Sequence, residues 1–377
     1  MQLSEVLISE IEAPLDGNDT SNEDIQILNP FNPTSIRVDT KNMQMDALIK
    51  RMRENEIDLE PSFQRRNNIW NDQVQSRLIE SMLIKIPLPA FYMDATNDDK
   101  WIIVDGLQRL NTVRRFVIDK KLALTSLEFL TDYNGKKFNE IPRNFQRRIE
   151  ETDIVVYLIQ PGTEKRAKFD IFRRINTGGL PLTPQEMRHA LNQGQATDFL
   201  KELAESENFL RATANGVSPK RMEDRECVLR FLAFSLLPSE KYTDYNFDQF
   251  LNDRMAELNT LSQIDISKLR LAFFKAMNLA EKIFDNDAFR KRYQINKTRH
   301  PINKALFECW SVNLSKLTNE EEKTLIKKKD ELKSKFIQSL LEDREFEVSI
   351  SQGTGSINRV KYRFSKIKKL IREVLDV

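Results

Sequence analysis

Asp105 and Gly106 directly follow the apolar run WIIV, and Gln108 and Arg109 lie at the start of the helix that the sequence predicts next. If WIIV is a buried strand, this junction is a strand-to-helix turn, where free backbone N–H groups and the positive end of the helix dipole attract anions. Glycine lets a ligand approach the backbone closely, and arginine can form two hydrogen bonds with a phosphate. Asp105 can hold a metal ion or a ribose hydroxyl. The junction is therefore a candidate nucleotide site.

The same junction also has a simpler explanation. Asp105 can cap the helix, Gly106 can form the turn, and the arginines can be solvated. Because Asp-Gly followed by arginine is a short and common pattern, its spacing alone favours this simpler interpretation.

A second polar group stands at Gln64 and Arg65, within the segment PSFQRRNNIW. These residues immediately precede elements that are expected to pack, so their side chains should point in a definite direction. Asn71 then predicts the N-cap of an amphipathic helix. The apolar face expected for this helix consists of Val74, Leu78, Met82 and Leu83.

A third group is the turn sequence NTGG, which separates two predicted helices. It consists of Asn176, Thr177, Gly178 and Gly179. Two adjacent glycines beside polar residues can form a concave nest of N–H groups for an anion, although a plain loop between helices explains them equally well. Thr183 and Glu186 then have the spacing of a capping box at the next helix start. His189 falls inside that helix and is expected to be structural.

The spacing of apolar residues predicts two structural regions. Up to about Leu191, the β-like runs IRVDT, LPAFYM, WIIVD and DIVVYLI alternate with helical runs such as MDALIKRMREN and TEKRAKFDIFRRI. Beyond Leu191 the spacing is almost wholly helical. We therefore expect a flexible leader at residues 1–35, an α/β domain with a small sheet at residues 36–192 and an α-helical domain at residues 193–377.

The 59 basic and 57 acidic residues nearly cancel, so contacts with DNA would have to come from local basic patches. Two segments qualify, RNFQRR with Arg147 and Arg148, and RVKYRFSKIKKLIR with Lys368 and Lys369. The second segment also fits an amphipathic helix with solvated lysines, which is the interpretation that we favour. The buried face of that helix would contain Val360, Phe364, Ile367, Leu370 and Ile371.

Cys227 and Cys309 both stand in apolar, helix-like surroundings, which predicts packed core thiols rather than a disulfide or a zinc site. No apolar run approaches the roughly 20 residues of a membrane span. The acidic N-terminus does not fit a secretory signal. We therefore expect a cytoplasmic protein that has no membrane partner.

Four motifs, taken together, carry a resemblance to a known family. In order and spacing, FQRRNNIW, IESMLIKIPLPAFY, VDGLQRLNTVRRF and FRRINTGGLPLTPQEMRHAL resemble the N-terminal domain family of the GmrSD type IV restriction systems. The mark of that family is a DGQQR motif on a ParB/sulfiredoxin-like fold. The resemblance covers roughly residues 36–192, and RMEDRECVLRFLAF and SINRVKYRF are similar to the helical portion that follows in many members. It implies an α+β protein, with a ParB/sulfiredoxin-like N-terminal α/β domain that has a small mixed sheet and an all-α C-terminal domain.

The resemblance also implies a function. Family members restrict modified phage DNA, and the DGQQR segment is associated with the binding and hydrolysis of nucleoside triphosphates. We therefore expect a nucleotide-binding, DNA-associated protein of an anti-phage restriction system, with a nucleoside triphosphate and Mg²⁺ as ligands. Leu107 stands where the family usually has glutamine. Since leucine can neither orient water nor bond a phosphate, this departure should affect hydrolysis more than binding.

The site that these arguments predict is drawn from all three polar groups. The expected catalytic residues are Asp105, Gln108 and Arg109, with Asp105 also the expected metal ligand. The expected nucleotide-binding and phosphate-binding residues are Gly106, Gln64, Arg65, Thr112, Asn176, Thr177, Gly178 and Gly179. Arg147, Arg148, Lys368 and Lys369 are the expected DNA-binding residues.

Two alternative functions stay open. One is a non-enzymatic DNA-binding adaptor with a degenerate nucleotide site, which Leu107 and the basic segments suggest. The other is a metal-dependent DNA nickase, in which Asp105 would need Glu60 or Glu80 beside it. With only His189 and His300 present, an HNH-type nuclease would have to be a separate partner subunit. The sequence is also compatible with a homo-oligomer.

Overall fold

The computed structural model describes residues 37–59, 70–163, 167–168, 171, 182–243, 246–293 and 299–376. The chain divides into an N-terminal unit, Asn29–Thr183, and a helical unit that contains Pro184–Val377. This division by contacts falls after Thr183, whereas the predicted domain boundary lies after residue 192. The reason is that helix α7 (Pro184–Leu191) packs against helices α10 and α11 of the helical unit. The predicted leader, residues 1–35, lies outside the described residues.

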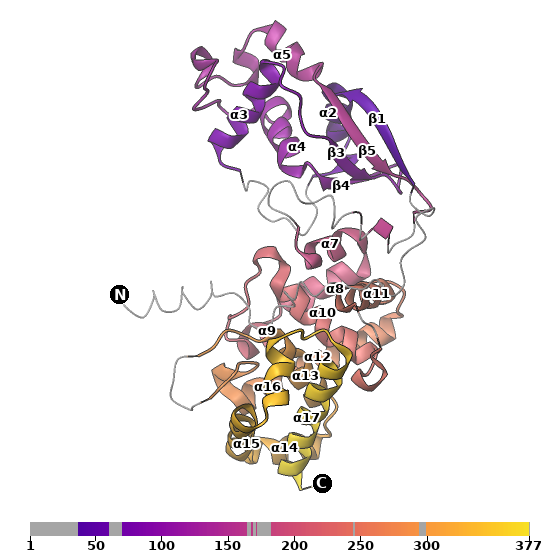
Figure 1. Cartoon of the computed structure of the whole chain (residues 1–377), viewed down its shortest axis with the longest axis vertical. Coiled ribbons are helices and arrows are strands. Elements are labelled where there is room, and N and C mark those ends of the chain that lie inside the picture. Colours follow the sequence, from indigo (N-terminus) through magenta and orange to yellow (C-terminus); the bar gives the residue numbers. More distant parts are fainter. Residues whose placement is uncertain are drawn as a thin grey trace, which may run out of the picture. The chain divides into compact units, whose positions relative to one another are not determined.

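The N-terminal unit contains a five-stranded mixed sheet in the order β1-β5-β3-β4-β2 (Figure 1). The strands are β1 (Val38–Gln44), β2 (Ile57–Asp58), β3 (Phe91–Asp94), β4 (Trp101–Asp105) and β5 (Asp153–Ile159). β1 and β5 are antiparallel, as are β3 and β4, whereas β3 runs parallel to β5 and β2 runs parallel to β4. The predicted α+β class with a small mixed sheet is thus confirmed.

Helices cover one face of this sheet (Figure 1). They are α2 (Met45–Arg53), α3 (Asp72–Leu83), α4 (Leu107–Val113), the π-helix η2 (Arg114–Ile118) that continues α4, and α5 (Arg143–Glu150). Two 3-10 turns, η3 (Thr131–Tyr133) and η4 (Phe138–Glu140), precede α5. Strand β5 shows why this face is the core, since Ile154, Val156 and Leu158 alternate inward while Val155 and Tyr157 are half-buried.

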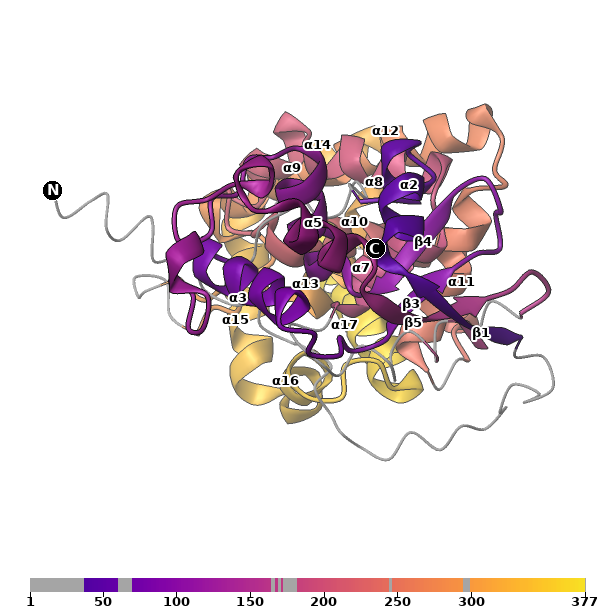
Figure 2. The same cartoon turned by 90° about the horizontal axis from the view of Figure 1, so that it is seen from above.

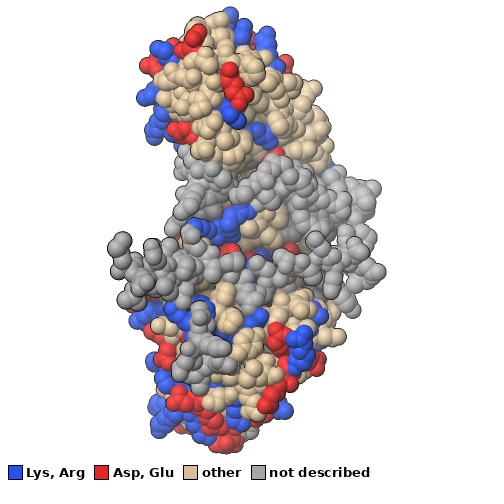
Figure 3. Space-filling model, turned by 60° about the vertical axis from the view of Figure 1, so that its left-hand side comes forward, with Lys and Arg blue, Asp and Glu red and all other residues tan. Residues whose placement is uncertain are grey.

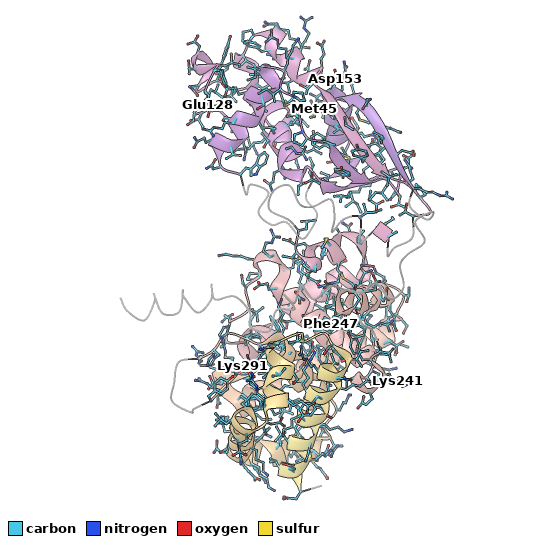
Figure 4. The ribbon with its side chains drawn as sticks, in the orientation of Figure 1. Met45, Glu128, Asp153, Lys241, Phe247 and Lys291 are labelled. Atoms are coloured by element: carbon cyan, nitrogen blue, oxygen red, sulfur yellow. The ribbon has the colours of Figure 1, made fainter. Side chains whose placement is uncertain are left out.

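The ends of neighbouring elements in this unit are joined by backbone hydrogen bonds. The Met45 amide, at the start of α2, donates to the Thr152 carbonyl immediately before Asp153 and strand β5. Met45 and Asp153 accordingly lie in the same part of the N-terminal unit (Figure 4). This hydrogen bond therefore connects the start of α2 to the start of strand β5, at the point where β1 ends.

Helix α3 corrects one prediction from the sequence. Asn71 is its N-cap as predicted, because the Asn71 Oδ1 accepts a hydrogen bond of 2.9 Å from the Val74 amide. However, Val74 is exposed and Leu78 is only half-buried. The face that is buried consists of Gln75, Ser76, Ile79, Glu80, Met82 and Leu83. Ser76 and Glu80 occupy this face because they accept hydrogen bonds from backbone amides of the loop 125–130. Gln75 instead donates to the Trp70 carbonyl at 2.8 Å and accepts from Arg115 at 3.1 Å.

The helical unit is all-α within the described ranges, as predicted. Its helices are α7, α8 (Gln195–Ala204), α9 (Glu207–Ala212), α10 (Glu223–Leu236), α11 (Phe247–Leu258), α12 (Gln263–Phe284), α13 (Lys304–Ser315), α14 (Asn319–Lys327), α15 (Lys329–Glu342), α16 (Arg344–Ser351) and α17 (Ile357–Leu375). Short 3-10 turns are η5 (Lys220–Met222), η6 (Ser239–Lys241) and η7 (Asp285–Asp287). The capping box predicted at Thr318 is present, since the Thr318 amide donates to Glu321 Oε2 at 2.7 Å. The predicted faces of α17 are also confirmed, and its five apolar residues are buried.

Helix α13 lies at the centre of the helical unit and is buried on nearly every side. It packs against α10, α12 and α17. Cys227 of α10 and Cys309 of α13 are both fully buried free thiols, as predicted. Burial raises the pKa of the Cys227 thiol to about 12, so this cysteine is not nucleophilic at neutral pH.

Buried ion pairs connect the three helices α10, α13 and α17. Glu308, fully buried on α13, accepts a hydrogen bond of 3.2 Å from Arg230 Nη1 and one of 2.9 Å from Arg363 Nε. Glu226 in turn is paired with Arg230 and Lys304, each at 2.9 Å. Burial opposes ionisation of Glu226, but these two cations hold its pKa well below the usual value. Arg363 of the basic C-terminal segment is therefore a core residue.

An aromatic cluster surrounds one end of this network. Phe247, labelled in Figure 4, packs with Phe234, Tyr242 and Phe250, and the Arg230 guanidinium lies 4.6 Å from the centre of its ring. The charged network is thus enclosed by apolar groups on the side of α11. An internal network of this kind is expected to fix the mutual orientation of the helices.

Candidate functional site

The predicted turn exists and requires a glycine. Strand β4 ends at Asp105, and Gly106 adopts a left-handed conformation with φ of +104° directly before α4. A Cβ atom at Gly106 would lie 2.4 Å from Cδ1 of Phe91. Backbone conformation and packing against β3 therefore both exclude a side chain at this position.

Arg109 holds this turn against the beginning of strand β3. Its guanidinium donates to the Pro89 carbonyl through Nη1, to the Ala90 carbonyl at 3.1 Å and to Asp105 Oδ2 at 2.8 Å. It also lies over the Phe91 ring, 4.4 Å from the ring centre. Arg109 is only 8% exposed. In this arrangement Arg109 positions the turn, and a phosphate contact would require it to exchange a protein partner.

Asp105 is the accessible acidic group of the turn. Its side chain is 24% exposed. Burial raises the pKa of Asp105 more than the Arg109 charge and the Gly106 N–H group lower it. Burial also disfavours the charged form of Arg109 and therefore lowers the pKa of Arg109, although its guanidinium remains charged at neutral pH. The turn therefore presents a carboxylate that is more basic than a solvated aspartate.

The other predicted residues of α4 have different surroundings. Gln108 is half-buried, and its side chain forms no hydrogen bond with any residue that the structure describes. Thr112 is buried, and its hydroxyl donates to the Gln108 carbonyl at 2.8 Å. Leu107 packs against the apolar core of the N-terminal unit. The Gln108 amide is thus available for a hydrogen bond with a ligand, whereas the Thr112 hydroxyl already donates a hydrogen bond within α4.

Several predicted residues lie outside the described residues. They are Gln64, Arg65, Asn176, Thr177, Gly178 and Gly179, as well as the alternative ligand Glu60. Their expected contribution to a phosphate site therefore stays a prediction.

Asp105, the predicted metal ligand, has no cluster of further possible ligands around it in the described part of the chain. No group of three or more His, Cys, Asp or Glu residues suited to a metal ion occurs there. Glu80, the other described carboxylate considered for a nickase, accepts hydrogen bonds from the amides of Glu128, Phe129 and Leu130. Glu80 therefore has a different role from Asp105.

Sequence reasoning missed a polar group on the less buried face of the sheet. Tyr92 pairs with Asp105 across β3 and β4, and its ring stacks on Tyr157 with centres 4.7 Å apart. Burial, Tyr157 and Asp105 raise the pKa of Tyr92. Two residues further along β3, the buried Asp94 forms an ion pair of 3.0 Å with Lys168. The alternation of Tyr92 and Asp94 in AFYMD was the available signal, because residues two apart on a strand share one face.

The predicted DNA-binding residues are all exposed. Arg147 and Arg148 lie on α5, where Arg148 also donates to the Leu83 carbonyl at 3.1 Å. Lys368 and Lys369 lie on the outer side of α17, and Lys369 is 3.9 Å from Glu373. These four side chains are therefore open to solvent, whereas Arg363 of the C-terminal segment is buried.

Helix α7 contributes a buried polar group to the helical unit. Arg188 is fully buried, donates through Nε to Gln185 Oε1 at 2.9 Å and pairs with Asp248 at 2.8 Å. His189 is buried beside it. Burial and the Arg225 charge lower the pKa of His189 to about 3, so the imidazole is neutral at physiological pH. The predicted structural role of this histidine agrees with its location.

A mixed sheet in which a strand ends in a glycine turn at a helix start defines the N-terminal unit as a small α/β domain. Residues 46–192 match the sequence model of the GmrSD restriction endonuclease N-terminal domain. The match confirms, for this part of the chain, the resemblance that the four motifs predicted. Comparisons with curated proteins and with solved structures found no match. The described helices include none with the length and apolarity that crossing a membrane requires.

Replacing Gly106 should destabilise the N-terminal unit. We expect Gly106→Ala to cost about 2–5 kcal/mol, because it combines backbone strain with a clash against Phe91. Gly135→Ala is a matched control, since Gly135 also has a positive φ of +83° but an added Cβ atom there would meet no other atom within 4 Å. Denaturant unfolding of both variants measures the difference. Equal losses of stability would contradict the proposed packing of the turn.

His189 should make the helical unit sensitive to acid. Its folded pKa lies below the unfolded value of 6.5, so the unfolded chain binds the proton more tightly. Its stabilising contribution is complete above pH 6.5 and falls by up to about 1.4 kcal/mol for each pH unit below it. Urea unfolding between pH 7 and pH 4 should show a shallower loss for His189→Gln than for the native chain. The control His300→Gln, at an exposed histidine, should retain the native slope.

Proposed function

We propose that the GmrSD-type N-terminal unit binds a nucleoside triphosphate at the Asp105–Arg109 turn and hydrolyses it with the help of Mg²⁺. The family match supports a restriction-type, DNA-associated defence protein as the broader class. The observation that carries the finer proposal is the rigid turn itself. Gly106 lets strand β4 turn directly into α4, so the half-buried Asp105 carboxylate lies at the start of that helix, where N–H groups and the helix dipole favour an anion.

Asp105 is the residue suited to hold the metal ion. Mg²⁺ is commonly bound by one or two carboxylates together with phosphate oxygens and water, so a single protein ligand is compatible with a nucleotide-dependent site. The bound ion would supply positive charge that stabilises the phosphates as they react. Arg109 keeps the Asp105 carboxylate in place through its 2.8 Å hydrogen bond.

Gln108 is the residue suited to act on water. An amide side chain offers both a donor and an acceptor, which is what orienting a water molecule requires. Gln108 is half-buried and lies one residue before Arg109 on α4. Leu107 cannot take this role, because it is apolar and packs on the core. The departure from DGQQR thus leaves one of the two motif glutamines in place.

A second candidate function is nucleotide-dependent DNA binding without hydrolysis. It is favoured by the engagement of Arg109 with the Pro89 and Ala90 carbonyls. An arginine that stays there contributes no direct charge to the reacting phosphate. In that case nucleotide binding would act as a switch, and chemistry on DNA would belong to a partner subunit.

Asp105→Asn tests the proposed hydrolysis. Asparagine retains the size and an acceptor for Arg109 but is a poor Mg²⁺ ligand, so phosphate release should fall on the order of 100-fold. Release is to be measured from each of the four ribonucleoside triphosphates, with and without Mg²⁺ and DNA. Asp99→Asn, at an exposed aspartate, should behave like the native chain.

The pH profile provides a second measurement of the same residue. Because the pKa of Asp105 is raised above 3.8, the protonated carboxyl persists to higher pH and cannot hold the metal ion there. Hydrolysis should therefore increase as pH rises through a value above 3.8. Two results would contradict the role of Asp105. One is phosphate release by the native chain that does not fall at acid pH, and the other is unchanged phosphate release by Asp105→Asn. No release from any nucleotide would leave only the non-hydrolytic candidate.

A further inference from the structure

The loop Thr125–Leu130 has no regular secondary structure, yet one buried carboxylate fixes its backbone. Glu80 of α3 accepts hydrogen bonds from the amides of Glu128 at 3.0 Å and of Phe129 and Leu130 at 2.8 Å each. Glu80 is only 4% exposed. These bonds compensate the buried charge and hold its pKa below the ordinary value, although burial acts in the opposite direction. Three consecutive amides are thereby held in one arrangement.

Two further side chains hold the same loop. The Ser76 hydroxyl of α3 accepts from the Thr125 amide at 3.0 Å, and the Asn134 Oδ1 accepts from the Leu127 amide at 3.1 Å. Five amides of a six-residue loop therefore donate to side chains of α3 or of the next turn. Such a loop is preorganised, because little backbone freedom is left to lose on binding.

Phe129 projects from this fixed loop into solvent. It is 71% exposed, although its own amide is bonded to Glu80. Glu128, the residue before it, lies on the outer edge of the N-terminal unit beside α3 (Figure 4). Single exposed apolar residues are common on proteins. Here, however, buried polar groups hold the backbone that presents the ring.

The surroundings of Phe129 are basic. Residues 120–148 contain seven basic and three acidic side chains. The exposed basic residues are Lys120, Lys121, Lys136, Lys137, Arg143, Arg147 and Arg148. The nearest acidic residue, Glu128, is paired with Arg77 at 2.8 Å. In Figure 3, which turns this side forward, lysine and arginine side chains stand at the border of an uncharged area of the N-terminal unit, with some acidic side chains among them.

Lys136 and Lys137 lie close to the Phe129 loop. The Leu124 amide donates to the Lys136 carbonyl at 3.0 Å, and the Gly135 amide donates back to the Leu124 carbonyl at 2.6 Å. Tyr133 of the same turn packs edge-on against Phe145 of α5, with ring centres 5.1 Å apart. Helix α5 also lies beside α3 (Figures 1 and 2). We call Phe129, Lys136 and Lys137 the Phe129 surface.

We propose that the Phe129 surface binds single-stranded or locally unpaired DNA, with the Phe129 ring stacked on a base and Lys136 and Lys137 facing phosphates. This assignment rests on the DNA association of the proposed function and not on nucleotide hydrolysis. The Lys137 amide donates to Glu140 Oε2 at 2.7 Å. The ammonium groups of Lys136 and Lys137 form no ion pair with any residue that the structure describes, so both charges are available to a polyanion. An aromatic ring beside a basic track is the arrangement that binds single strands with little sequence preference.

Duplex DNA fits this surface less well. In a paired helix the faces of the bases are covered by their neighbours, so a side chain must first unstack them to reach a face. A single strand offers its bases to the Phe129 ring without that cost. The surface should therefore prefer single-stranded DNA to a duplex of the same sequence.

The test uses the full chain and a single-stranded oligonucleotide that contains 2-aminopurine, whose fluorescence reports stacking. Phe129→Ala should bind about tenfold more weakly and should lose the fluorescence change, because the stacking of one base on an aromatic ring contributes affinity of about this order. Leu271→Ala is the matched control, since Leu271 of α12 is a large apolar residue with 69% exposure. It should bind like the native chain.

The contribution of the two lysines is measured separately, through the salt dependence of the affinity for single-stranded DNA. Replacing both Lys136 and Lys137 by alanine should make the slope of log affinity against log salt shallower by about 1.4, as expected for two phosphate contacts with a single strand. Equal affinity of Phe129→Ala and Leu271→Ala would overturn the proposal, as would an unchanged salt slope. Equal binding of the duplex would overturn the assigned preference for unpaired bases.

Glu80→Gln tests the positioning of the loop. The variant retains Phe129 but cannot accept all three amide hydrogen bonds, so hydrogen exchange at residues 128–130 should accelerate and affinity for the single strand should fall. If exchange accelerates while affinity stays native, Glu80 does not position the ring. Asp105→Asn should bind DNA like the native chain. Loss of hydrolysis in that variant and loss of DNA binding in Phe129→Ala are thus independent results.

Discussion

The contact of Arg109 with the beginning of strand β3 is the interaction on which the candidate site depends. One buried guanidinium joins two backbone carbonyls, the Phe91 ring and the Asp105 carboxylate. Gly106 can approach Phe91 only because it lacks a side chain. Strand β3, the end of β4 and the first turn of α4 are therefore positioned together, and removing either Arg109 or the glycine would release all three.

In this arrangement the arginine of the Asp-Gly-Leu-Gln-Arg sequence has a different role from the predicted one. Arginine at the start of a helix suggested a phosphate ligand, but here its charge is directed inward and stabilises the turn. The groups left for a ligand are the backbone at the helix start, the Asp105 carboxylate and the Gln108 amide. A site of this composition can bind phosphates through N–H groups and through a metal ion without a direct arginine contact.

Much of the architecture could be predicted from the sequence, because the short apolar run DIVVYLI is typical of a buried strand and the helical spacing in the C-terminal half indicates helices with a buried face. The partners of Arg109 could not, since Pro89 and Ala90 contribute carbonyl groups that every residue possesses. The roles of Glu80 and Ser76 in holding the loop 125–130 could not be predicted for a related reason. The burial of a polar residue on a helix face is explained only when the loop amides that donate hydrogen bonds to it are known. Similarly, α7 forms the end of the motif FRRINTGGLPLTPQEMRHAL but packs with the helical unit, which only its contacts with α10 and α11 reveal.

Hydrogen exchange of the full chain, measured by mass spectrometry with and without nucleoside triphosphate and Mg²⁺, tests the central claim most directly. If the nucleotide binds at the glycine turn, amide exchange should slow in the segment 101–116, where the helix-start N–H groups would gain phosphate acceptors. Slowing should require Mg²⁺ if Asp105 holds the ion. Nucleotide-dependent protection confined to the helical unit, with residues 101–116 unchanged at saturating nucleotide, would contradict the assignment of the site.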